Sequence, residues 1–88
     1  MYHVKFMDCA PENRQKFREL LKQFKSEGGA EVIGAFYPRG SGYMFATVTK
    51  YDSYAIWEKY WAETSKKREE GINIVTKDMD MFFEKIEL

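Results

Sequence analysis

The sequence of 88 residues contains one cysteine, one histidine, two prolines and no excess of charge of either sign. A lone cysteine, Cys9, cannot form an internal disulfide or the cysteine cluster of a metal site, so we expect it to be a small buried residue at a strand end. The 14 basic and 14 acidic residues cancel. The chain therefore lacks the positive charge that attracts nucleic acid or an anionic membrane.

Long apolar runs are also missing. No stretch approaches the roughly 18 uncharged apolar residues of a membrane span. The N-terminus, where Lys5 and Asp8 follow closely on Met1, lacks the charged and then apolar layout of a signal peptide. These absences predict a cytoplasmic protein, and nothing in the residue pattern calls for a metal or another cofactor.

Hydrophobic residues make up 44% of the chain and aromatic residues 17%, which excludes an intrinsically disordered segment. The length predicts a single domain over residues 1–88, because it is too short for two independent cores. A domain of this size leaves roughly a third of its unfolded surface exposed after folding. A partner that covered part of this surface would therefore stabilise the fold.

Local patterns predict six main elements. Apolar and polar residues alternate from Tyr2 to Met7, as in a strand, and Pro11 suits the first turn of a helix that Gly28 ends. The expected elements are strands over 2–7, 32–37, 43–49 and 79–88, with helices over 11–27 and from Asp52 or Ser53 to Glu70; residues 72–76 could form a short extended piece of their own. This order is the split βαβ pattern of an α+β ferredoxin-like sandwich, with a four-stranded antiparallel sheet and two helices on one face.

The face that the helices leave open decides the function. Alternate residues of a strand point to opposite faces of the sheet, and we assign the more uniformly apolar of the two sets to the face under the helices. That set comprises Tyr2, Val4 and Phe6 in the first strand and Met44, Ala46 and Val48 in the hairpin. The open face then carries His3, Lys5, Met7, Tyr43 and Phe45. Such a face is too apolar to remain in water, so we expect something to cover it.

One candidate cover is RNA. The RNA-recognition motif has this topology, and Gly42-Tyr43-Met44-Phe45 resembles part of its aromatic strand signature, whose rings stack on bases. The match is partial, since Ser41 stands where the motif has Lys or Arg, and Met44 where it has Gly or Ala. With no net positive charge as well, nucleic-acid binding is the weaker prediction, and we expect none.

The other candidate cover is a second copy of the chain. The run His3-Val4-Lys5-Phe6, a helix begun by proline, and Gly42-Tyr43 leading to Tyr51-Asp52-Ser53 and an aromatic helix resemble the dimeric α/β-barrel superfamily. It includes stress-responsive A/B-barrel proteins, polyketide cyclases similar to olivetolic acid cyclase, antibiotic-biosynthesis monooxygenases and EthD-like proteins. The resemblance implies a homodimer in which two open sheet faces form a barrel. It also implies small-molecule chemistry, often cofactor-free oxygenation or cyclisation.

His3 is the candidate catalytic residue, because an imidazole in a cavity can transfer a proton at neutral pH. Cyclase-like members carry a histidine at a matching place in the first strand and a second one in a His-Pro-Ala-His segment. This chain has Trp57 to Trp61 in that region and no second histidine. We expect a cavity lined by His3, Tyr43, Phe45 and Tyr37 that holds a compact apolar or aromatic molecule.

A structural or regulatory homodimer without a reaction is the alternative, with His3 as a polar packing residue and the barrel filled by its own side chains. Trp57 and Trp61 lie one helical turn apart, which favours a core or interface stripe over a cofactor site. Asp78 and Asp80 could bind a cation together with Glu84, but a lone pair at this spacing is more typical of a solvated edge. The sequence thus leaves open whether the protein is an enzyme.

Overall fold

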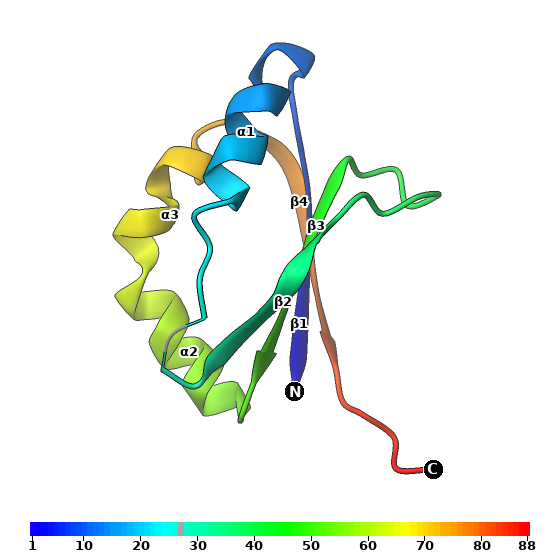
Figure 1. Ribbon diagram of the computed structural model, residues 1–88, viewed down its shortest axis with the longest axis vertical. Coiled ribbons are helices and arrows are strands. Elements are labelled where there is room, and N and C mark those ends of the chain that lie inside the picture. Colours follow the sequence, from blue (N-terminus) through cyan, green and yellow to red (C-terminus); the bar gives the residue numbers. More distant parts are fainter. Residues whose placement is uncertain (27) are drawn as a thin grey trace.

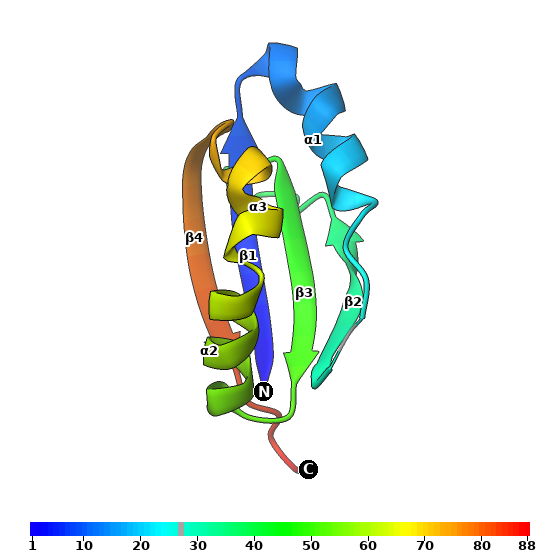
Figure 2. The ribbon, with the colours of Figure 1, turned by 90° about the vertical axis from the view of Figure 1, so that its left-hand side faces the viewer.

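The computed structural model describes residues 1–26 and 28–88, except for the side chains at positions 67 and 70. One four-stranded sheet carries the helices on one of its faces (Figure 1, Figure 2). The elements in chain order are β1 (Tyr2–Cys9), the 3-10 helix η1 (Pro11–Asn13), α1 (Arg14–Leu21), β2 (Ala30–Phe36), β3 (Phe45–Tyr51), α2 (Tyr54–Glu63), α3 (Ser65–Ile72) and β4 (Val75–Phe83).

The sheet has the strand order β2-β3-β1-β4, and each neighbouring pair is antiparallel. The N-terminal strand β1 is therefore central, with β3 on one side and β4 on the other. This arrangement confirms the predicted α+β class and the four-stranded antiparallel sheet. The strand order is compatible with a ferredoxin-like sandwich.

Both predicted helices are interrupted. The first begins as the 3-10 turn η1, and its α-helical part ends at Leu21, well before Gly28. The second is capped by Ser53, whose Oγ accepts a hydrogen bond from the backbone N–H of Ile56 at 3.2 Å, and it breaks at Thr64. The hydroxyl of Thr64 donates to the carbonyl of Tyr60 at 2.7 Å, and such side-chain bonds to the preceding turn bend helices.

The last strand begins and ends earlier than predicted. Its register with β1 runs from Cys9 opposite Val75 to Tyr2 opposite Phe83. Residues 84–88 would continue past the start of β1, where no strand remains to pair with them. They form an extended tail (Figure 1), so pairing with β1, rather than the apolar pattern alone, sets the strand's end.

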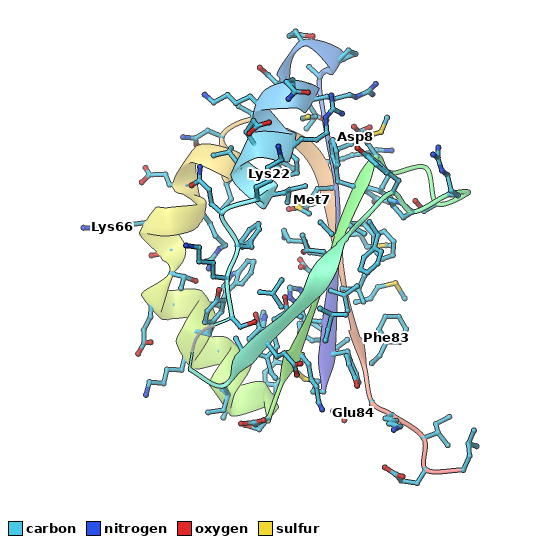
Figure 3. The ribbon with its side chains drawn as sticks, viewed as in Figure 1. Met7, Asp8, Lys22, Lys66, Phe83 and Glu84 are labelled. Carbon is cyan, nitrogen blue, oxygen red and sulfur yellow. The ribbon has the colours of Figure 1, made fainter. Side chains whose placement is uncertain are left out.

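The predicted assignment of the two sheet faces is wrong for β1 and most of β3. His3, Met7 and Phe45 are only 4%, 5% and 2% exposed, because they lie under the helices. Figure 3 shows Met7 pointing from β1 toward the helical layer, whereas Phe83 lies on the opposite side of the sheet. The residues that the register places on the open face are instead Tyr2, Val4, Phe6, Ala46, Val48, Met79, Met81 and Phe83.

The prediction failed because both faces of the sheet carry apolar residues. The rule that the more apolar set of each strand faces the helices therefore selected the open face. The set under the helices includes polar residues such as Lys5, Thr47 and Thr49, which line a cavity rather than a packed core. Met44, just before β3, is the member of its predicted set that does pack against the core under the helices.

Cys9 ends β1 and is 3% exposed, as the sequence predicted. It packs in a cluster with Met7, Phe17 and Phe45. Burial raises the pKa of its thiol, which keeps the sulfur in the unreactive protonated form. Cys9 is therefore a packing residue.

Candidate functional site

A cavity of about 920 Å³ lies between the sheet and the helical layer. Its volume is within the range of pockets that hold drug-sized ligands. From the sheet, its floor includes His3, Lys5, Met7, Thr47, Thr49 and Tyr51. From α1, α2 and α3, its roof includes Phe17, Leu20, Tyr60, Trp61, Thr64 and Arg68.

The cavity exists because the helices meet the sheet mainly at its two ends. At one end, the ring of Phe17 from α1 packs on that of Phe45 from β3, with centroids 5.0 Å apart. At the other end, Trp57 of α2 packs edge-on against Phe82 of β4, with centroids 4.9 Å apart. Between these contacts the second helix breaks at Thr64 and α1 ends at Leu21. In Figure 2, α2 and α3 lie in front of β1 and α1 lies at the upper end, so the middle of β3 has no helix over it.

His3 lies at the aromatic end of this cavity. Its Nε2 is 2.7 Å from Oδ1 of Asp80 on β4, and its ring stacks on Phe82 with centroids 4.9 Å apart. Trp57 and Trp61 contact the same imidazole in T-shaped arrangements, with centroids 5.8 and 5.7 Å away. The ring is therefore fixed by one carboxylate and three aromatic side chains.

The surroundings keep His3 neutral. Burial lowers its pKa below the ordinary value of 6.5, and the hydrogen bond to Asp80 opposes this change without cancelling it. Because a carboxylate only accepts, Asp80 holds the tautomer with the proton on Nε2. Nδ1 is then the basic nitrogen, and at neutral pH it is free of a proton.

Lys5 holds the carboxylate in place. In the register of β1 and β4 it lies opposite Asp80, and its Nζ is 3.2 and 3.3 Å from the two oxygens. The same ammonium is 3.3 Å from Oδ2 of Asp78. Asp78 and Asp80 thus pair with the central strand, and within the described residues no group of three His, Cys, Asp or Glu side chains could hold a metal ion.

Arg68 of α3 forms the roof beside Trp61. Its guanidinium lies 3.5 Å from the centroid of the Trp61 ring. Nη1 donates to Oγ1 of Thr64 at 2.6 Å, and Nη2 donates to the carbonyl of Trp61 at 2.8 Å. Burial lowers the pKa of Arg68, so its positive charge is partly withdrawn from water inside the cavity.

Hydroxyl groups complete the polar lining. Tyr51 is 2% exposed, and burial raises its pKa to about 12. It therefore stays a neutral phenol at any physiological pH. Together with Thr47, Thr49 and Tyr60, it gives the cavity hydrogen-bonding groups among apolar walls.

The predicted site residues divide between the two sides of the sheet. His3 lines the cavity, and Phe45 lies on the same face but is packed in the core between Phe17 and Tyr37. Tyr37 is half exposed, and its ring is tilted against that of Phe45 with centroids 6.0 Å apart. Tyr43 packs on the ring of Phe6 at 5.7 Å, which places it on the open side. The structure does not bring Tyr43 together with His3.

Asp80, Trp61 and Arg68 are among the residues of the site that the sequence did not indicate as its parts. The signal for Asp80 was present, because Asp78, Asp80 and Phe82 alternate along one face of a strand. Its contacts with His3 and Lys5 of β1 became evident only with the register of the sheet. Trp61 was identified as a buried helix residue, and Arg68 was hidden in a charged run that resembles a solvated helix end.

Comparisons with protein-family models, with curated proteins and with solved structures each found no match to this chain. Each helix in the described part of the chain is too short or too polar to cross a membrane.

Proposed function

We propose that the protein binds a compact, largely aromatic or apolar molecule in the cavity between its helices and its sheet, and that His3 accepts a proton from this molecule. One observation carries the proposal: the only histidine of the chain lines a cavity of about 920 Å³ while a carboxylate holds its other nitrogen. A neutral imidazole oriented by a carboxylate is a common arrangement for a general base.

The lining supports a small organic ligand. Aromatic and aliphatic walls with a few oriented polar groups are the usual composition of such a site. Phe17, Tyr60 and Trp61 provide the apolar surface, and His3 and Tyr51 provide polar groups. This site lies under the helices, and not between two sheets as the sequence suggested.

The open face of the sheet supports the second part of the proposal, a homodimer of the α/β-barrel type. Phe36, Met81 and Phe83 on this side are 50%, 38% and 45% exposed. Monomeric proteins rarely leave a contiguous apolar patch larger than a few hundred Å² in water. A second sheet packed about 10 Å away would remove it from solvent.

Charge at the rim of this face favours a second copy of the chain over another partner. In the register, Glu31 lies opposite Lys50 at one end of the face, and Asp8 lies opposite Lys77 at the other. Each end thus carries both signs around an apolar centre, as in protein interfaces. In a twofold dimer a surface meets itself, and this rim offers a carboxylate for each ammonium.

The burial of Phe45 argues against the RNA alternative. The resemblance to the RNA-recognition motif assigned base stacking to Tyr43 and Phe45, but Phe45 is 2% exposed and packs under the helices. A ring in that position cannot stack on a base. The structural dimer without a reaction is the remaining alternative, and it differs from our proposal in having no ligand in the cavity.

A fluorescence titration with N-phenyl-1-naphthylamine, an uncharged dye that brightens in apolar surroundings, tests ligand binding. We expect saturable binding of one dye molecule per chain in the micromolar range, which corresponds to about 8 kcal/mol at 1 μM. Absence of saturable binding would leave the structural dimer as the better account.

A further inference from the structure

Arg68 carries a charge that the described part of the protein does not neutralise. The groups that accept its hydrogen bonds are the hydroxyl of Thr64 and the carbonyl of Trp61, and both are neutral. No carboxylate among the described residues forms an ion pair with it. Its Nε is buried without a hydrogen-bond partner in this same part of the chain.

A guanidinium in this state favours an anion beside it. Arg has five N–H donors, of which the structure shows two in use. Burying a charge without a counter-ion is costly, and a charge-assisted hydrogen bond recovers part of that cost. Stacking on Trp61 at 3.5 Å fixes the plane of the guanidinium, so little side-chain freedom remains to be lost when an anion binds.

Basic side chains outnumber acidic ones in the lining of the cavity. Besides Arg68, the lysines Lys5, Lys22 and Lys25 line it, against the carboxylate of Asp78. Lys5 is paired with Asp78 and Asp80, and Lys22 lies 3.1 Å from Glu19. A cleft with low-dielectric walls concentrates the potential of such charges, so the interior attracts an anion.

We propose that the ligand is an aromatic carboxylic acid whose carboxylate lies against Arg68. A planar carboxylate matches one planar guanidinium, whereas a phosphate with its second charge would require more cations than the neighbourhood of Arg68 supplies. The aromatic part follows from the walls formed by Phe17, Tyr60 and Trp61. This inference rests on the proposed function, because it assumes that the cavity takes a ligand.

Arg68 and His3 act on one ligand because Trp61 connects them. The indole has Arg68 over its face and the imidazole of His3 against it at 5.7 Å. An acid anchored at Arg68 therefore has its body within the part of the cavity that His3 lines. Arg68 positions the carboxylate, and the neutral imidazole of His3 would accept the proton of a second acidic group on the ligand, such as a phenol O–H, leaving a phenolate beside the imidazolium.

Matched probes that differ only in charge test the inference. 2-Naphthoate and 2-naphthamide have the same ring and nearly the same shape, and each can be titrated against the bound dye N-phenyl-1-naphthylamine. We expect the wild-type chain to bind the naphthoate at least about tenfold more tightly, the factor that 1.4 kcal/mol represents. In Arg68→Gln this preference should fall to about twofold or less.

Two further variants distinguish a specific effect of Arg68 from the effect of losing any positive charge and from the effect of misfolding. Lys25→Gln removes the same unit of charge from the cavity rim and should keep the preference. If Arg68→Gln fails to fold, Arg68→Lys takes its place in the experiment. It keeps the positive charge at this position and should retain part of the preference for the naphthoate. The anion site would be overturned if Arg68→Gln and Lys25→Gln lost the preference for naphthoate equally, or if the wild type bound the two probes equally well. In either case, binding of the dye would still support the cavity. If neither the probes nor the dye binds, both proposals fail.

Discussion

At the scale of single residues, the site depends on how β1 and β4 align two side chains. His3 lies opposite Phe82 in the register, and Asp80, two residues away, points to the same face. Lys5 lies opposite Asp80 and contacts both of its oxygens. The sequence indicated His3 as the candidate acid or base, but it contained no information on which distant carboxylate would meet it.

The titration of His3 gives the first prediction. Its pKa should lie below 6.5 in the folded protein, because burial outweighs the nearby carboxylate of Asp80. Asp80→Asn removes the charge that raises this pKa and should lower it further, while Lys5 and Arg68, which both lower it, remain. NMR measurement is direct, since the ring protons of the one histidine give one titration curve. A pKa above 6.5, or a rise in Asp80→Asn, would contradict this account.

The same shift affects stability. A histidine whose folded pKa is lowered binds fewer protons in the folded chain than in the unfolded chain between the two pKa values. Stability therefore increases with pH in that window and is lost as the pH falls from 6.5 toward the folded pKa. In His3→Gln the free energy of unfolding, measured in urea, should lose this part of its pH dependence. This result would support the lowered pKa that NMR measures directly.

At the scale of elements, the sequence predicted which main helices and strands form and in what order, and it named Asp52 or Ser53 as the helix cap, of which Ser53 takes the role. It did not predict the face assignment, because the rule that the more apolar set faces the helices fails when the other face is also apolar. It also did not predict the break at Thr64. The hydroxyl of Thr64 bonds to the carbonyl of Tyr60 one turn earlier, and a residue's helix propensity does not show whether its side chain makes such a bond. The cavity follows from these two features.

Gly71 of α3 offers a matched pair of variants for the cavity. A Cβ at this position would lie 3.9 Å from Phe17 and 4.0 Å from Leu20, which is ordinary contact. Gly71→Ala should therefore fold normally, gain up to about 1 kcal/mol from helix propensity, and bind N-phenyl-1-naphthylamine like the wild type. Gly71→Leu should fill the space beside Phe17 and weaken dye binding by about tenfold or more. Equal dye affinity in the two variants would place the dye elsewhere.

At the scale of the whole molecule, the sheet has two different faces. Its helix face holds the cavity with polar groups inside, and its open face carries apolar residues with charges of both signs at the rim. The sequence correctly indicated that an apolar face remains after the helices are placed. It named Met7 and Phe45 as members of that face, and the structure replaces them with residues such as Val4 and Met81.

The dimer gives the next prediction. Met81 lies on the open face, opposite Val4 of β1, and is 38% exposed. Met81→Glu should leave the monomer folded but place a carboxylate in the apolar interface, which weakens association by about 100-fold or more. Light scattering during size exclusion should give twice the monomer mass of 10.5 kDa for the wild type and the monomer mass for Met81→Glu.

Ala62→Glu is the control for that experiment. It adds the same carboxylate at an exposed position of α2, on the helical side, and should remain dimeric. A wild-type chain that stays monomeric at about 100 μM would contradict the homodimer. A dimer that persists in Met81→Glu would place the interface elsewhere.

The central claim is that the cavity under the helices is the ligand site, and its most direct test is an NMR titration of the ¹⁵N-labelled protein with N-phenyl-1-naphthylamine. We expect shifts confined to the amides of His3 and Thr49 and the indole of Trp61, which line the cavity. The amides of Phe36 and Phe83, whose side chains lie on the open side, should not move. Shifts at those two residues with none at Trp61 would contradict the account.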